Sequence, residues 1–91
     1  MLLCGSVFAD DKIVLGLDVY NNKAQCGVCH TLQAARSTGY IGPNFDQLNP
    51  TIPQIISAVI NGIGVMPSWE GILTDEEIEA VAYYIFNSTN K

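Results

Sequence analysis

The segment QCGVCHTL, residues 25–32, brings two cysteines and a histidine within five positions of one another. Cys26 and Cys29 are separated by two residues, and His30 follows Cys29 directly. Cysteine and histidine side chains bind metals, form disulfides and attach cofactors. What this segment holds therefore determines what the rest of the chain folds around.

Two metal or redox alternatives fit the chain poorly. A structural zinc site needs four protein ligands, usually cysteine or histidine, and after Ala9 the cysteines and histidines of the chain are Cys26, Cys29 and His30 alone. A thioredoxin-like cysteine pair would need a strand–helix–strand setting, and no strand is expected here. An ordinary disulfide, or a histidine that simply lies at the surface, remains open.

The spacing favours the attachment motif of a c-type haem, Cys-x-x-Cys-His. Each thiol adds to one vinyl group of the porphyrin, and the two vinyl groups lie on neighbouring pyrrole edges. Two intervening residues let one helical turn reach both vinyls, and His30 then points its imidazole at the iron. The motif therefore predicts one covalently bound haem c, which would also supply a core for a chain of modest helices.

The haem iron needs a second axial ligand, and the composition limits the choice. His30 is the single histidine, and the two methionines are Met1 and Met66. Met66 lies in the loop GIGVMPSWEG, residues 62–71, where Pro67 would stiffen the chain beside it. A methionine can also simply fill a gap in a core, but Met66 lies on no helical stripe. His30 and Met66 are the predicted iron ligands.

The charge of the chain excludes several classes of function. The 91 residues include nine acidic and four basic side chains, which gives a net charge of −5. Nucleic acid binding needs lysine and arginine to neutralise phosphates, so it is excluded, and an anionic membrane surface is equally unfavourable. No later stretch is apolar for long enough to span a bilayer, so stable membrane insertion is not expected.

The first nine residues, MLLCGSVFA, predict the remnant of a signal peptide. They carry no charge, and the small-residue pattern ending at Ala9 precedes the acidic pair Asp10 and Asp11. Residues 10–91 would then form a single small domain, exported across the inner membrane to the periplasm. Cys4 would leave with the signal, because the bulky Leu3 before it disfavours a lipoprotein anchor.

Helical periodicity predicts a first helix over residues 12–23. Ile13, Leu17 and Tyr20 recur at the spacing of one helical face and are expected to be buried. Gly16 shares that side with Tyr20, so a partner helix can approach closely over the glycine.

A second helix is expected over residues 52–61, between an N-cap at Thr51 and a stop at Gly62. A third begins at Thr74, which stands at capping-box spacing from Glu77, and ends near Asn87. Both carry apolar stripes that should be buried: Ile52, Ile55, Ile56, Val59 and Ile60 in the second, and Ile78, Val81, Ala82, Tyr84 and Ile85 in the third.

The long connection between the first two helices is expected to be mostly loop. A short helix fits residues 31–35 and a helical turn fits residues 46–48, while glycine, proline and asparagine dominate the rest. No segment alternates as a strand, so the predicted fold class is all-α. Loops this long in a small domain are usually functional.

Taken together, these segments resemble the class I c-type cytochromes, which are small single-haem electron carriers. The resemblance covers nearly all of residues 10–91, through CGVCH, IGPNF, NGIGVMPSW and AYYIF in that order. It implies three main helices and long loops wrapped around one covalent haem. It also implies a single-electron carrier rather than an enzyme.

The resemblance implies further roles for individual residues. The carbonyl of Pro43 would accept a hydrogen bond from His30 Nδ1, and Tyr40 or Trp69 would reach a haem propionate. Gly16 and Tyr20 of the first helix would cross the last helix near Tyr84. The exposed haem edge, with Val28 and residues 65–67 around it, would form the electron gateway.

The chain departs from the family pattern in two ways. Tyr20 lies six residues before Cys26, about two more than expected, so a small added loop is predicted there. The lysine-rich docking face of some family members is absent, since the basic residues are Lys12, Lys23, Arg36 and Lys91. The partner type of those members therefore does not carry over.

Three functions remain to be distinguished. The first is a free carrier whose partners are redox proteins, such as a dehydrogenase subunit or a terminal oxidase or peroxidase. The second is the cytochrome subunit of a periplasmic dehydrogenase, for example a molybdenum-dependent sulfite-oxidising enzyme. The third, a gas sensor or peroxidase, would require Met66 to leave the iron.

Overall fold

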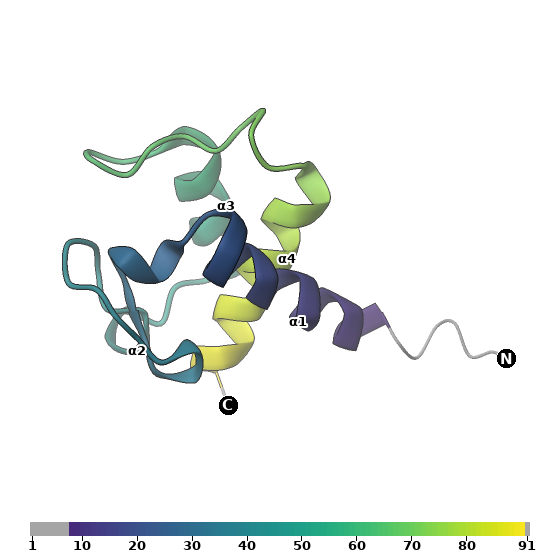
Figure 1. Ribbon diagram of the computed structural model, residues 1–91, viewed down its shortest axis with the longest axis horizontal. Coiled ribbons are helices and arrows are strands. Elements are labelled where there is room, and N and C mark those ends of the chain that lie inside the picture. Colours follow the sequence, from purple (N-terminus) through teal and green to yellow (C-terminus); the bar gives the residue numbers. More distant parts are fainter. Residues whose placement is uncertain (1–7, 91) are drawn as a thin grey trace, which may run out of the picture.

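The computed structural model describes residues 8–90, and helices dominate it (Figure 1). The expected signal remnant, residues 1–9, lies outside the described residues except for its last two, which begin the first helix. In chain order the elements are α1 (Phe8–Asp18), the π-helical turn η2 (Val19–Lys23), the 3₁₀ turn η3 (Cys26–Val28), β1 (Thr31–Leu32), the 3₁₀ turn η4 (Gln33–Ala35), β2 (Ser37–Thr38), α2 (Phe45–Leu48), α3 (Ile52–Asn61) and α4 (Asp75–Thr89).

The first helix crosses the last one closely, as expected, and Gly16 makes the approach possible (Figure 1). A Cβ atom on Gly16 would lie 2.3 Å from the Ala80 carbonyl oxygen and 2.5 Å from Tyr84 Cβ. The rings of Tyr20 and Tyr84 meet edge to face, with centroids 5.8 Å apart. The expectation that Leu17 is buried was wrong, because the face turned to α4 centres on Gly16 and Tyr20 and leaves Leu17 exposed.

The two later helices begin at the predicted caps. Thr74 Oγ1 accepts from the Glu77 N–H at 3.1 Å, and Glu77 Oε1 accepts from the Thr74 N–H at 2.8 Å. Thr51 caps α3 in the same reciprocal way with Gln54, a capping box that the sequence analysis did not identify. These local bonds satisfy backbone groups that would otherwise be unpaired at the helix N-termini.

The small loop expected before Cys26 is absent. The chain stays helical and takes up the extra residues in the π-helical turn η2, closed by the Ala24 N–H on the Val19 carbonyl at 2.8 Å. A wider turn of this kind inserts a residue without leaving the helix. Gln25 then adopts a left-handed conformation, with φ of 51°, and redirects the chain into η3.

The expected helix over residues 31–35 is only partly present, and the expectation of no strands was wrong. Residues 31–32 pair with residues 37–38 as a two-stranded antiparallel hairpin, and only η4 between them is helical. Ser37 holds the hairpin, since its Oγ accepts from the Leu32 N–H at 3.0 Å. Arg36 closes the turn in a left-handed conformation.

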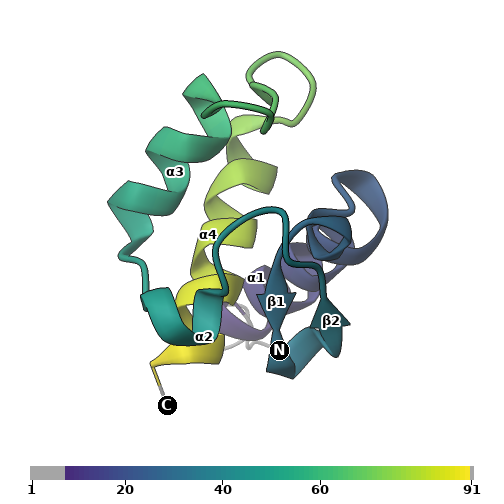
Figure 2. The same ribbon diagram turned by 90° about the vertical axis from the view of Figure 1, so that its left-hand side faces the viewer.

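The apolar core is built around α4, against which α1 and α3 both pack, and it includes buried residues of η2, β1, α2 and α3. Figure 2 shows α3 beside α4, with residues 62–73 folded over one end of the pair and the β1–β2 hairpin on the other side of α4. Among residues 8–90, each helix is too short or too polar to cross a bilayer. The buried apolar residues are Val19, Tyr20, Leu32, Phe45, Ile55, Val59, Leu73, Ile78, Ala80, Val81, Ala82, Tyr84 and Ile85.

Candidate haem-binding site

The two cysteines of the motif lie on a single helical turn. In η3 the Cys29 and His30 N–H groups both donate to the Cys26 carbonyl, at 3.2 and 3.0 Å. Cys26 and Cys29 are unpaired thiols, each partly buried. One turn thus presents both thiols and the imidazole together, as the attachment motif requires.

The surroundings of the thiols disfavour a redox-active cysteine pair. Within residues 8–90, no group of three or more His, Cys, Asp and Glu residues is arranged to hold a metal ion. Burial raises the pKa of the Cys26 thiol to about 11. A redox-active dithiol instead depends on a lowered pKa that supplies thiolate at neutral pH.

His30 is buried and held from two sides. Its Nδ1 lies 2.8 Å from the Pro43 carbonyl oxygen, which is the hydrogen bond that the resemblance implied. Its ring stacks on Phe45, with centroids 4.2 Å apart and planes inclined by 16°. With Nδ1 bonded to a carbonyl, Nε2 is the nitrogen available to a metal.

The loop that carries Pro43 is folded tightly against the motif. The Gly42 N–H donates to the Cys29 carbonyl at 2.7 Å, and Thr31 Oγ1 donates to the Gly39 carbonyl at 2.8 Å. A Cβ atom on Gly42 would lie 2.4 Å from His30 Cε1, so only glycine fits there without displacing the ring. Sequence reasoning quoted IGPNF for this loop but assigned no role to Gly42.

Phe45 is a second residue that sequence reasoning missed. Asn44 caps the short helix α2, because its Oδ1 accepts from the Asp46 N–H at 2.9 Å and the Gln47 N–H at 3.3 Å. This cap fixes Phe45 at the start of α2, under the His30 ring. The Asn-Phe pair that follows Pro43 was the available signal, since asparagine is a strong N-cap residue.

Met66 closes a two-residue turn. The Ile63 N–H donates to the Met66 carbonyl at 3.1 Å, and the Met66 N–H donates to the Ile63 carbonyl at 2.9 Å. Gly64 stands inside the turn with φ of 57°, a conformation that favours glycine. The Met66 side chain is partly buried against the core. The turn therefore fixes the backbone from which the thioether projects.

The two candidates for a propionate contact differ in their surroundings. Trp69 is partly buried, and its backbone N–H donates to the Val59 carbonyl of α3 at 2.8 Å. Tyr40 is 91% exposed. Trp69 is thus held in place by the body of the fold, whereas the Tyr40 side chain projects into solvent.

Two hydroxyl groups, those of Tyr20 and Ser37, form a hydrogen bond close to the Cys26–His30 segment. Tyr20 Oη and Ser37 Oγ are 2.8 Å apart, and the Tyr20 side chain is fully buried. Burial raises the pKa of Tyr20 to about 12, although the Ser37 hydrogen bond opposes the shift. The pair ties the start of η2 to β2, two segments that precede and follow Cys26–His30 in the chain.

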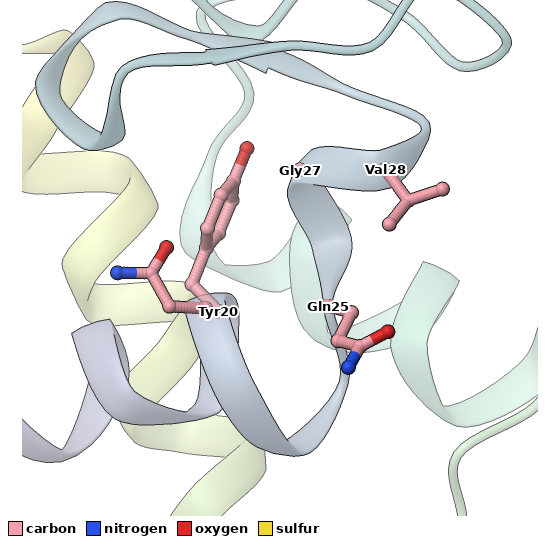
Figure 3. Close-up of a pocket in the computed structure, with 5 residues that line it drawn as sticks. Tyr20, Gln25, Gly27 and Val28 are labelled. Atoms are coloured by element: carbon pink, nitrogen blue, oxygen red, sulfur yellow. The ribbon is translucent and has the colours of Figure 1, made fainter.

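A cavity of about 280 Å³ lies next to the motif (Figure 3). Gly27 and Val28, the two residues between the cysteines, border it together with Tyr20, Asn21 and Gln25. Neither thiol nor the imidazole lines it. We therefore assign this cavity no part in holding the haem.

Known proteins match this chain over most of its length. The family described as "Cytochrome C oxidase, cbb3-type, subunit III" matches residues 13–85. Cytochrome c6 of Bryopsis maxima is 33% identical over 85% of this chain and 92% of its own length. Chloroplastic cytochrome c6 of Chlamydomonas reinhardtii is 35% identical over 81% of this chain, which spans 53% of that protein's length.

A solved structure is similar as well. The c-type cytochrome SorU of Sinorhizobium meliloti superposes with a TM-score of 0.84 and is 46% identical, over 90% of this chain and 95% of its own. These relatives are named as cytochromes, which favours an electron carrier over a dehydrogenase subunit. The chain belongs to the cbb3-type cytochrome c family and is a small class I c-type cytochrome, an electron carrier with one covalently bound haem c.

Proposed function

We propose that this chain carries single electrons between redox proteins of the periplasm, with His30 and Met66 as the axial ligands of its haem. Cys26 and Cys29 would form the two thioether bonds. The observation that supports this assignment best is the fixed imidazole of His30, which is bonded through Nδ1 to the Pro43 carbonyl, so that Nε2 would be the nitrogen that binds the iron. It follows the two unpaired thiols directly in the chain.

The two axial side chains act on the redox balance in opposite directions. When bound, haem c supplies the one-electron exchange. The hydrogen bond from His30 Nδ1 to Pro43 makes the imidazole a stronger donor, which favours the oxidised state. The Met66 thioether favours the reduced state and raises the potential. With both ligands in place no position is open to oxygen or peroxide, which argues against a sensor or a peroxidase.

Two hydrogen bonds hold the loop that carries Met66 against α3. Ser68 Oγ donates to the Ile60 carbonyl, and the Trp69 N–H donates to the Val59 carbonyl, so both bonds anchor the loop to the end of α3. Pro67 restricts the backbone directly after Met66. A loop backbone held this way loses little conformational freedom when the Met66 thioether binds, which strengthens a neutral and intrinsically weak ligand.

The propionate contact is proposed for Trp69 in preference to Tyr40. The indole N–H of Trp69 is a donor only, and an anionic propionate is a suitable acceptor. The backbone of Trp69 is already fixed on α3. Tyr40 would have to give up the freedom of a side chain that is 91% exposed.

The electron gateway is proposed at the exposed apolar residues near the two ligands. Val28 is 67% exposed and Val65 is 85% exposed, and Pro67 is exposed as well. Transient redox complexes use small interfaces of this kind. The partners are other redox proteins, and residues 10–91 would be the exported domain after cleavage behind Ala9.

Two measurements on the purified protein test the assignment. The red colour should stay with the denatured polypeptide after acid–acetone extraction, because thioether bonds survive that treatment. A Met66→Ala variant should lose the weak far-red band of the oxidised protein and show a lower potential, because the thioether no longer stabilises the reduced state.

Either measurement can contradict the proposal. Haem that extracts freely would mean that Cys26 and Cys29 form no thioether bonds. A Met66→Ala spectrum and potential equal to those of the wild type would assign the sixth position to another side chain. Val14→Ala, at an exposed side chain of α1, offers the comparison, since it should change neither property.

A further inference from the structure

A groove between α3 and α4 combines apolar and acidic side chains. It has a volume of about 170 Å³ and is lined by Ile56, Ile60, Asp75, Ile78 and Glu79, and we call it the α3–α4 groove. The three isoleucines contact the core, whereas Asp75 and Glu79 are exposed and one helical turn apart on α4. Figure 2 shows the two helices side by side, with residues 62–73 at their common end.

Among residues 8–90, neither carboxylate of the groove forms an ion pair with a basic side chain. In the part of the chain that the structure describes, the one ion pair joins Lys23 to Glu77, and it includes neither Asp75 nor Glu79. The chain carries nine acidic and four basic side chains. A cation from another molecule is therefore the complementary charge for this groove.

The residues that line the groove also indicate which kind of cation fits it. A small metal ion would leave the isoleucines uncovered, and an apolar ligand would leave the carboxylates unpaired. A lysine side chain matches both, because its methylene stem lies along apolar surface while its ammonium group meets the carboxylates. We propose that the α3–α4 groove receives a lysine side chain of the redox partner. This inference rests on the proposed carrier function.

The position of the groove connects it to electron transfer. The Ile60 carbonyl accepts a hydrogen bond from Ser68 Oγ, so the groove and the Met66 loop share the end of α3. On that loop Ile63 is 68% exposed and Val65 is 85% exposed. A partner anchored by its lysine in the groove would lie next to these apolar side chains and close to the Met66 ligand.

The test uses the reduced holoprotein and a blocked Gly-Lys-Gly-Lys-Gly peptide, followed by NMR of the isoleucine methyl groups. The peptide should shift the methyls of Ile56, Ile60 and Ile78. The double variant Asp75→Asn/Glu79→Gln should weaken binding roughly two- to thirtyfold, the range for loss of two exposed ion pairs.

Matched controls separate the groove from general electrostatic attraction. The double variant Glu70→Gln/Glu76→Gln makes the same change in net charge at exposed carboxylates outside the groove, and it should weaken binding less than about twofold. A peptide with acetylated lysines keeps the stem but loses the charge. It should leave the three methyls unshifted.

The outcomes distinguish this inference from the function on which it rests. Equal weakening by the two double variants, or methyl shifts confined to Ile63 and Ile72, would overturn the groove while the redox activity stays intact. A protein that shows no one-electron redox step in potentiometry would overturn the carrier function, whatever the peptide does.

Discussion

Replacing Gly42 with alanine tests whether the His30 imidazole is held as closely as the structure shows. A Cβ atom at position 42 would lie 2.4 Å from His30 Cε1, 2.8 Å from Nδ1 and 2.9 Å from Nε2. The Gly42 backbone is itself held by its hydrogen bond to the Cys29 carbonyl. To restore ordinary contact at about 3.4 Å, the ring has to move by roughly 1 Å, which strains its hydrogen bond to Pro43.

The expected cost of Gly42→Ala follows from that displacement. Overpacking of this size costs about 1–3 kcal/mol, and for a domain this small about 2 kcal/mol lowers Tm by roughly 8–16 °C. A longer bond from His30 to Pro43 also makes the imidazole a weaker donor, which destabilises the oxidised state and raises the potential. Denaturant unfolding of the oxidised holoprotein and a potentiometric titration measure the two effects.

Gly71→Ala is the matched control for this variant. Gly71 has φ of 83° and no atom within 4 Å of its Cβ position, so the substitution costs backbone strain alone, about 1–2 kcal/mol. It should leave the potential unchanged. If Gly42→Ala unfolds at the wild-type denaturant concentration and keeps the wild-type potential, the close packing of the loop on His30 is refuted.

Three further perturbations test other parts of the structure. Burial raises the pKa of Tyr20 from 10.0 to about 12, so its protonated hydroxyl should add about 2–3 kcal/mol to the free energy of unfolding below pH 10, and this stabilisation should be lost between pH 10 and 12. Urea unfolding over that range should show a steeper loss of stability in the wild type than in Tyr20→Phe. Gly16→Ala should cost about 1–3 kcal/mol in thermal unfolding, despite alanine's helix propensity, whereas Val14→Ala on the exposed face should be nearly neutral. Charge reversal at Lys12 and Arg36, which leaves the Lys23–Glu77 ion pair intact, should leave the rate of reduction by the natural donor almost unchanged at low and high salt, and a large loss would assign docking to these residues.

Features encoded by local sequence were predictable. The bounds of α3 and the start of α4 follow from caps and apolar stripes within a few residues of each other, and the structure reproduces them. The haem motif is equally local, because both thiols and the imidazole come from one turn. Prediction worked here because the determining interactions span four residues or fewer.

Features that depend on distant partners were not predictable. Thr31 and Leu32 enter a strand rather than a helix because Ser37 and Gly39 supply hydrogen bonds from farther along the chain. The exposure of Leu17 depends on where α4 crosses α1, and a helical stripe alone does not give that direction. The stacking of Phe45 on His30 likewise joins residues from two different segments.

The ion pair of Lys23 with Glu77 shows how such distant contacts serve the haem motif. Glu77 uses one carboxylate oxygen to cap α4 at Thr74 and the other to bind Lys23 at the end of η2. The Lys23 hydrogen bond lowers the pKa of Glu77, so the carboxylate stays charged for both contacts. The sequence reveals the cap but not the lysine 54 positions away. Because Lys23 precedes Cys26 by one short bend, this pair ties the approach to the motif to α4, the helix that also packs against Gly16.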